Sequence, residues 1–224
     1  MWIKICGICN LESARIVVDA QPDAIGLNFY ESSPRHVPQE TAKQILQLLP
    51  ETILPVGLFV NHEKDDILHT VETLGLSTIQ LHGDESPDFL HDLQKQKPEL
   101  QLMKAFRLGE NGWQNLENYL EECQQLGISL FACLLDAYSS DAYGGTGKKI
   151  AWSEIPEHYR HDDWPPLILA GGLTSENVAD AISKSHPWGV DVAGGVESSP
   201  GIKEKLTVQR FLDAANAKNP ATED

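Results

Sequence analysis

Long apolar runs are missing from the 224-residue sequence. No run approaches the ~20 consecutive apolar residues that a membrane-spanning helix needs, so we expect no interaction with a membrane. The N-terminal segment, MWIKICGICN, also lacks the basic residues and the long apolar stretch of a signal peptide. It is typical instead of a strand that begins at once. We therefore expect a cytoplasmic protein.

Cysteines and basic residues are scarce. Four cysteines in a chain of this length do not suggest a disulfide framework, which is typical of short secreted domains. The 33 acidic residues outnumber the 17 basic ones, for a formal net charge of −16. Such a surface repels nucleic acid, which we exclude as a partner. An anionic metabolite would need a local pocket of positive charge or of backbone amides.

Short apolar runs alternate with amphipathic helical patterns from one end of the chain to the other. The runs are almost continuously apolar, as expected for parallel strands that are buried on both faces. We predict strands at 2–6, 23–29, 53–60, 77–81, 100–106, 128–135, 166–169 and 188–192.

The segments between these runs carry helix signals. Asn10 and Thr174 are suitable N-caps, and Ser86 followed by Pro87 places a cap and a proline at the start of another helix. Gly75 is placed to end the third helix.

Successive predicted strands begin roughly 20 to 40 residues apart, which is the size of a βα unit with its loops. Eight such units predict a compact α/β fold, a single (β/α)₈ TIM barrel. An open doubly wound sheet would show the same alternation, but eight units of similar size favour closure. We assign one barrel domain to residues 1–217 and a flexible C-terminal tail to residues 218–224.

Polar and reactive residues fall at the carboxyl ends of the predicted strands, where barrels of this type carry their active sites. Cys6 ends the first strand, and it would serve as a nucleophile, a general base or a small core residue. Lys4 lies on the same face of that strand and would favour the thiolate. Asp136 ends the sixth strand, where its carboxylate needs a partner or a substrate, or else caps the following loop. A thiol and a carboxyl across a barrel mouth would make a base–acid pair.

Glycine pairs follow the seventh and eighth strands, at Gly171-Gly172 and Gly194-Gly195. Loops at these positions form the usual phosphate site of such barrels, and glycine lets backbone N–H groups approach a phosphate. The alternative is a pair of tight turns that require positive φ. Gly145 lies in a third glycine-rich segment, GGTG, which we predict to be a closing loop beside the same site.

Three more residues are candidates for substrate binding. Arg35, in the loop after the second strand, suits a carboxylate, although a solvated loop arginine is the alternative. Gln80 and His82 lie at the end of the fourth strand, and His82 is also compatible with a structural role. The other histidines show no metal-ligand spacing, and the C-G-I-C sequence at 6–9 is by itself weak evidence for a redox or zinc site.

Several segments, taken in order, resemble phosphoribosylanthranilate isomerases. The resemblance covers residues 2–212 and is most specific in KICG, QLHG and GVE-x-x-PG-x-K. The segments are KICG, GLNFYESSPR, GLFVN, IQLHGDE, LLDAYSSDAYGGTGKKIAW, LILAGGLTSENV and GVDVAGGVESSPGIK.

The resemblance implies a (β/α)₈ barrel that needs neither metal nor cofactor and that acts on a phosphosugar. The implied reaction is an Amadori rearrangement of N-(5'-phosphoribosyl)anthranilate to 1-(2-carboxyphenylamino)-1-deoxyribulose 5-phosphate, in tryptophan biosynthesis. It makes Asp136 the general acid that opens the ribose ring and Cys6 the general base that removes the C2 proton. It also assigns Arg35 to the anthranilate carboxylate and the glycine turns to the phosphate. We expect the chain to act as a monomer.

The sequence departs from the family pattern in two places. Ala193-Gly194 stand where serines are usual, and Cys9 replaces a polar residue.

Three other functions compete with this one. The related histidine-pathway isomerase typically has an aspartate where this chain has Cys6. A barrel that only binds phosphosugars would need neither Cys6 nor Asp136. A redox protein would form a reversible disulfide within C-G-I-C.

Overall fold

Eight parallel strands form a closed barrel in the computed structural model, which describes residues 1–108, 112–136 and 151–217. The first strand pairs with the second and also with the eighth, so the sheet has no free edge. This closure excludes the open doubly wound alternative. The strands are β1 (Trp2–Cys6), β2 (Ala24–Asn28), β3 (Leu54–Phe59), β4 (Thr78–Leu81), β5 (Gln101–Arg107), β6 (Leu130–Asp136), β7 (Leu167–Ala170) and β8 (Gly189–Val192).

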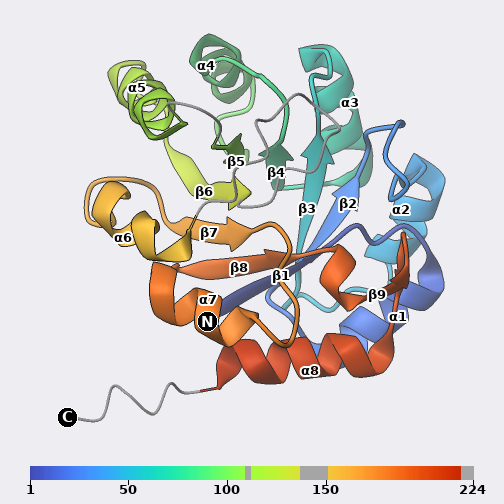
Figure 1. The fold of residues 1–224 in the computed structure, drawn as a ribbon. Coiled ribbons are helices and arrows are strands. Elements are labelled where there is room, and N and C mark those ends of the chain that lie inside the picture. Colours follow the sequence, from blue (N-terminus) through green and yellow to red (C-terminus); the bar gives the residue numbers. More distant parts are fainter. Residues whose placement is uncertain (109–111, 137–150, 218–224) are drawn as a thin grey trace.

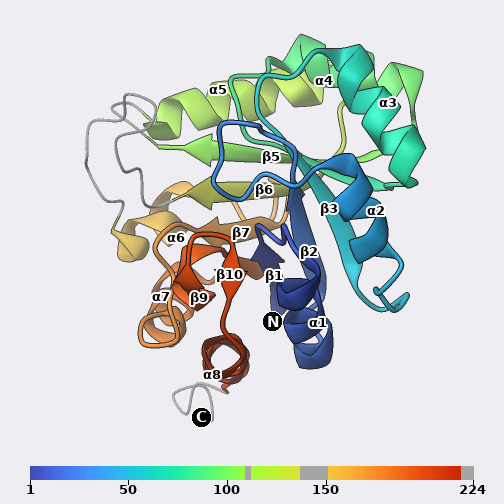
Figure 2. The same cartoon turned by 90° about the vertical axis from the view of Figure 1, so that its right-hand side faces the viewer.

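Helices follow the strands and lie outside them, as Figure 1 shows. The loop after β8 adds a 3₁₀ turn, η2 (Gly194–Val196), and a short hairpin of β9 (Glu197–Ser199) and β10 (Ile202–Lys203), both labelled in Figure 2. A second 3₁₀ turn, η1 (Trp152–Glu154), precedes α6. The helices are α1 (Leu11–Ala20), α2 (Gln39–Leu46), α3 (Lys64–Leu74), α4 (Pro87–Gln96), α5 (Gly112–Gln125), α6 (Ile155–His158), α7 (Val178–Ser185) and α8 (Lys205–Asn216).

The predicted caps are confirmed in three of four cases. Asn10 accepts a hydrogen bond from the Ser13 amide at 2.8 Å, and Ser86 accepts one from the Phe89 amide at 3.3 Å. Gly75 ends α3 in the left-handed conformation, with φ 66°. The fourth was wrong, because α7 begins at Val178 with Asn177 as its N-cap residue.

Two separate apolar layers surround and fill the barrel. Outward-facing strand residues such as Ile5 and Ile79 pack with helix residues such as Val17 and Phe211, all of them fully buried. Inward-facing residues form a smaller cluster of Ala24, Val56, Met103, Ala105, Ala132, Leu134, Ile168 and Ala170. Because side chains alternate along each strand, the two layers together make the strands continuously apolar in sequence.

Aromatic rings close the amino-terminal end of the barrel. Trp2 stacks on Trp188 with ring centroids 5.0 Å apart, and Phe131 meets both rings edge-on. The barrel interior is therefore filled at this end, and its polar groups lie toward the opposite, carboxyl end. Within the described ranges, no helix is both long and apolar enough to cross a membrane.

A matched pair of leucines on α8 tests the outer layer. Leu212 is 6% exposed and Leu206 is 63% exposed. We expect Leu212→Ala to lower the free energy of unfolding by about 2–5 kcal/mol, because the substitution leaves a cavity in the layer between helix and barrel. The same change at Leu206 should cost less than about 0.5 kcal/mol. Urea denaturation followed by circular dichroism measures both, and equal losses would contradict the assigned packing.

Candidate active site

Cys6 lies at the carboxyl end of β1 and faces the barrel interior. It pairs in register with Gly26 of β2, and a Cβ atom built on Gly26 would lie only 2.6 Å from the Cys6 sulfur. The thiol therefore occupies the space that a side chain at position 26 would fill. Cys9 points elsewhere, with its sulfur 3.4 Å from the carbonyl oxygen of Gly201, and both cysteines are free thiols.

A buried ion pair lies directly below the thiol. Lys4 is fully buried and donates a hydrogen bond from Nζ to Oδ1 of Asp191 on β8, at 2.7 Å. Burial lowers the pKa of Lys4, but the Asp191 carboxylate and the Cys6 sulfur together outweigh this effect and hold the pKa above its ordinary value. Lys4 therefore keeps its proton, as a cation beside Cys6.

The ionisation of Cys6 reflects opposing influences. Burial raises the pKa of the Cys6 thiol, and the Asp191 carboxylate raises it further. The charge of Lys4, the charge of Lys203 and a hydrogen bond from Lys4 oppose this rise, and the net pKa of the thiol is raised. The interaction with Lys4 predicted from the sequence is present, but it only moderates the effect of burial.

Asp136 ends β6 on the far side of the barrel mouth from Cys6 and is half-buried. Its Oδ2 lies 3.9 Å from Nε2 of His82. Burial lowers the pKa of His82 to about 3, so the imidazole is neutral and the two residues do not form an ion pair. Gln80 Nε2 lies 2.9 Å from His82 Nδ1, and with Gln80 as donor the imidazole carries its proton on Nε2, toward Asp136.

Arg35, from the loop after β2, reaches across to the loop after β8. Its Nε and Nη2 donate to the carboxylate of Glu197 at 2.9 and 2.7 Å. The same carboxylate accepts a hydrogen bond from Lys203 Nζ at 2.7 Å. Arg35 is therefore a positioned side chain and not a solvated loop arginine.

The two glycine turns lie against each other at the carboxyl ends of β7 and β8. Gly171 and Gly172 have φ of 88° and 64°, in the region that favours glycine. A Cβ atom on Gly195 would lie 1.8 Å from the carbonyl oxygen of Leu173, so only glycine fits there. Gly194 lies beside the Arg35 guanidinium, whose Nη2 would be 3.3 Å from an added Cβ. Local geometry explains these glycines, and it also exposes backbone at the barrel mouth.

A second buried ion pair supports the loops near His82. Lys104 Nζ donates to Oε2 of Glu85 at 3.0 Å and to the carbonyl oxygen of Gly83 at 2.7 Å. Glu85 in turn accepts hydrogen bonds from the backbone amides of Asn61 and Gly83. The loops after β3 and β4 are thereby held together on the outer side of the barrel wall.

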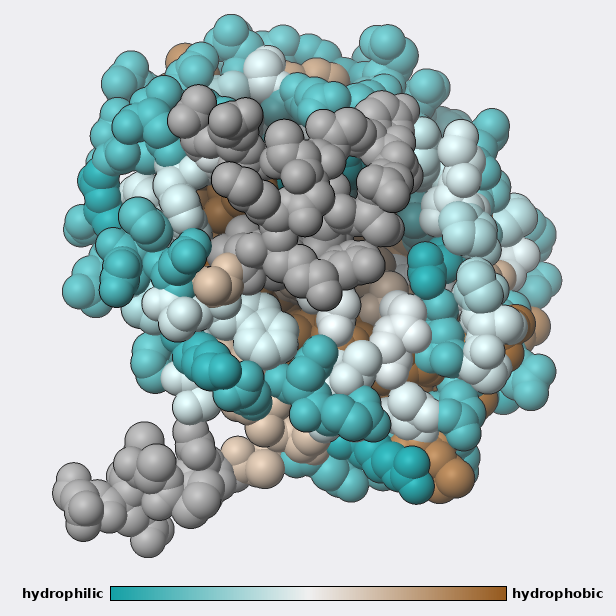
Figure 3. Space-filling model, in the orientation of Figure 1, coloured by the Kyte–Doolittle hydropathy of each residue, from teal (hydrophilic) through white to brown (hydrophobic). Residues whose placement is uncertain are grey.

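On the face drawn in Figure 3, hydrophilic residues predominate outside the grey region, and hydrophobic ones appear in small patches between them. Gly145 lies outside the described residues. Among the residues that the structure describes, no group of three or more His, Cys, Asp and Glu side chains is arranged to hold a metal ion.

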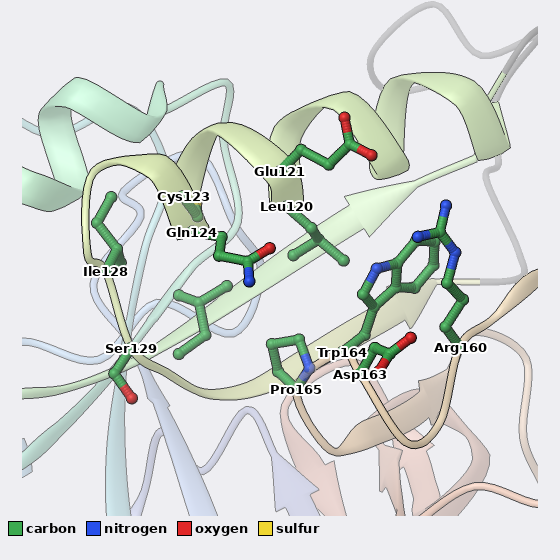
Figure 4. A pocket seen from close by; sticks show the side chains of 11 residues that line it. Leu120, Glu121, Cys123, Gln124, Ile128, Ser129, Arg160, Asp163, Trp164 and Pro165 are labelled. Carbon is green, nitrogen blue, oxygen red and sulfur yellow. The ribbon is translucent and has the colours of Figure 1, made fainter.

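A separate cavity of about 540 Å³ lies away from these residues, between α5 and the segment before β7. Figure 4 shows Glu121 and Gln124 on the helix side, facing Arg160 and Trp164 on the other. The Arg160 guanidinium lies over the Trp164 ring at 5.2 Å and pairs with Glu117. This cavity is close to the amino-terminal ends of β6 and β7, at the opposite end from Cys6.

Sequence reasoning did not assign a role to four residues of this site. Asp191 was detectable as a carboxylate inside an apolar strand, a signal like the one that singled out Asp136 at the end of β6. Glu197 and Lys203 belong to the GVE-x-x-PG-x-K segment, but nothing local indicates their partners. Gly26 carried no signal, because its role depends on the neighbouring strand.

A closed parallel barrel with a thiol, a carboxyl, an arginine and exposed glycine turns at its carboxyl end defines a class: the chain is a (β/α)₈-barrel enzyme. Residues 3–214 match the profile of the N-(5'phosphoribosyl)anthranilate (PRA) isomerase family. The chain belongs to this isomerase family, whose reaction is part of tryptophan biosynthesis.

Similar proteins and structures agree with this membership. The chain is 41% identical to an N-(5'-phosphoribosyl)anthranilate isomerase of Pelobacter propionicus, over 95% of this chain and 94% of that protein. It is 42% identical to one of Trichlorobacter lovleyi, over 96% and 97%. The crystal structure of the Thermotoga maritima enzyme superimposes with a TM-score of 0.80 at 36% identity, covering 95% of this chain and 97% of that one. A phosphoribosylanthranilate isomerase in complex with reduced 1-(o-carboxyphenylamino)-1-deoxyribulose 5-phosphate superimposes with a TM-score of 0.79 at 34% identity, covering 95% and 97%.

Gly26 provides a test of the position of the thiol. We expect Gly26→Ala to reduce kcat by on the order of 10–100-fold, because the new methyl group would displace the Cys6 sulfur from its place in the barrel wall. Gly57→Ala is the matched control, since its methyl group would meet Leu76 on the outer side of the barrel at 2.9 Å. Steady-state kinetics and melting temperatures are measured for both variants. A loss of turnover in Gly57→Ala alone would contradict the placement of Cys6.

Proposed function

We propose that the chain converts N-(5'-phosphoribosyl)anthranilate to 1-(2-carboxyphenylamino)-1-deoxyribulose 5-phosphate by general acid–base catalysis, with Asp136 as the acid and Cys6 as the base. The observation that carries this proposal is the pairing of Cys6 with the buried cation of Lys4, across the barrel mouth from a half-buried carboxyl. A chain that only bound the ligand would need neither feature.

Ring opening requires a proton on the ribose ring oxygen. Asp136 lies beside the imidazole of His82. Because this imidazole is neutral, it does not hold the Asp136 carboxylate in its ionised form, as an imidazolium cation would. In its protonated form Asp136 donates to the ring oxygen, the bond from C1 to this oxygen breaks, and the nitrogen lone pair forms a protonated Schiff base with C1.

The second step removes the proton from C2. Cys6 acts as the thiolate, and the nearby charges of Lys4 and Lys203 favour that form. The electron pair of the C2–H bond forms the C1–C2 double bond, and the Schiff base nitrogen becomes neutral. Protonation of C1 and loss of the C2 hydroxyl proton then give the ketone. Electrons move only from C2 to C1 of one molecule, so the chemistry requires no external oxidant or reductant.

The remaining residues would hold the substrate at its two anionic ends. Arg35 suits the planar carboxylate of anthranilate, because a guanidinium can donate to both of its oxygens. The backbone at Gly171, Gly172, Gly194 and Gly195 suits the phosphate. We assign Gln80, His82 and Lys4 to the sugar between them, and we propose a monomer in the cytoplasm, in keeping with four free cysteines.

Replacing either proposed catalytic residue tests the mechanism. We expect Cys6→Ala and Asp136→Asn each to lower kcat by about 10²–10⁴-fold, since each removes one proton transfer. Turnover is followed by the loss of anthranilate fluorescence of freshly generated substrate. Cys123→Ala, which alters a buried thiol on α5, should retain turnover. Retained turnover in Cys6→Ala would refute the role of the thiolate, and a wild-type chain that binds but does not react would indicate a binding protein.

The charge of Lys4 gives a second test, through pH. Because Lys4 lowers the pKa of the Cys6 thiol, Lys4→Met should raise that pKa and move the acid limb of the kcat/KM profile to higher pH. Asp191 raises the same pKa, so Lys4→Met/Asp191→Asn should move the limb back toward the wild-type position. An acid limb that stays in place in both variants would show that it does not report on Cys6.

A further inference from the structure

We propose that Glu197 and Lys203 are positioning residues that hold the carboxylate anchor and the phosphate turn at a fixed separation, and so select a ligand that carries both anions. This inference rests on the proposed function for the identity of the two anions. It assigns a substrate-positioning role to the two charged residues of the GVE-x-x-PG-x-K segment, neither of which the proposed function places on the substrate.

The Glu197 carboxylate is shared by two cations. Its Oε1 accepts from Arg35 Nε at 2.9 Å and from Lys203 Nζ at 2.7 Å, and its Oε2 accepts from Arg35 Nη2 at 2.7 Å. The side chains of Glu197 and Lys203 are 3% and 0% exposed. Burial raises the pKa of Glu197, but the hydrogen bonds from both cations outweigh it, so the group stays ionised.

Glu197 determines which edge of Arg35 is available to a ligand. A guanidinium has five N–H donors, and Glu197 takes the side formed by Nε and Nη2. The end of the guanidinium that includes Nη1 is not used by Glu197. The Arg35 side chain also packs over Gly7, where an added Cβ would lie 2.5 Å from its Cδ. Contacts on two sides therefore orient the guanidinium.

Lys203 connects the same carboxylate to the turn after β8. Its Nζ donates to the carbonyl oxygen of Ala193 at 3.0 Å, immediately before Gly194-Gly195. Its backbone amide donates to Ser13 Oγ on α1 at 3.0 Å, which anchors β10 to the barrel. One ammonium group thus contacts both the partner of Arg35 and the backbone of the proposed phosphate turn.

The cluster of Arg35, Glu197 and Lys203 carries two positive charges and one negative charge, in a chain whose net charge is −16. A surplus cation at this place attracts an anionic ligand locally. Because the charges are connected by hydrogen bonds, moving one anchor would move the other. A ligand with a carboxylate alone or a phosphate alone would use only part of this arrangement.

Lys203→Met is the first variant to test, because it leaves Glu197 paired with Arg35. We expect KM for phosphoribosylanthranilate and the inhibition constant of inorganic phosphate each to rise about tenfold, with kcat at the pH optimum changed less than threefold. The acid limb of kcat/KM should also move to higher pH, because Lys203 lowers the pKa of the Cys6 thiol. Lys4 acts in the same direction, and Asp191 raises this pKa. Lys205→Met, an exposed lysine two residues further on, should behave as wild type.

Glu197→Gln tests the other half and should weaken inhibition by anthranilate about tenfold. If it does not fold, Glu197→Gln/Lys203→Met removes both buried charges and should restore folding while KM stays high. Unchanged KM and inhibition constants with a lower melting temperature would overturn the proposal, as would a fall in kcat alone. If the wild type failed to turn over the substrate, the proposed function would fail. In that case the affinities of wild type and variants for phosphate and for anthranilate, measured by calorimetry, would still decide whether Glu197 and Lys203 position the two anion sites.

Discussion

The hydrogen bonds between β1 and β8 are the constraint on which the rest of the structure depends. They close the sheet and bring the first and last units of the chain side by side. Cys6 and Lys4 on β1 then meet Asp191 on β8, and the loop that carries Arg35 meets the loop that carries Glu197. Without closure, these groups would lie at opposite edges of a sheet and would not form one site.

Buried charge is organised in the same way throughout this site. Lys4 with Asp191, Lys203 with Glu197, and Lys104 with Glu85 each place an ammonium against a carboxylate out of contact with water. An isolated buried ion would cost several kcal/mol, so each charge is kept only while an oppositely charged partner remains beside it. The first pair joins β1 to β8, and the other two hold loops in place at the carboxyl end of the barrel. Each pair is neutral by itself, so the surplus positive charge at the site comes from Arg35, the second cation on Glu197.

Much of the architecture was predictable from the sequence, because the signals are local. Continuous apolar runs located the barrel strands, whose observed ends lie within two residues of the predicted ones. Asn10, Gly75 and Ser86 marked helix ends through bonds to residues three or four positions away. Thr174 failed as a cap because its hydroxyl accepts from the Glu176 amide in a turn, and α7 begins only after that turn, at Val178. The role of Gly26 was not predictable, because it depends on the atom that lies opposite on another strand.

The sequence by itself determined the order of strands and helices, and therefore which residues stand at the carboxyl ends of the strands. Periodicity and turn chemistry depend on neighbours along the chain, which are always present. Only the tertiary structure decided which charges are partners. Lys4 and Asp191 are 187 positions apart, and Arg35 and Glu197 are 162 apart. Their distances, and with them the ionisation of Cys6 and the orientation of Arg35, follow from barrel closure and loop packing, for which no local pattern exists.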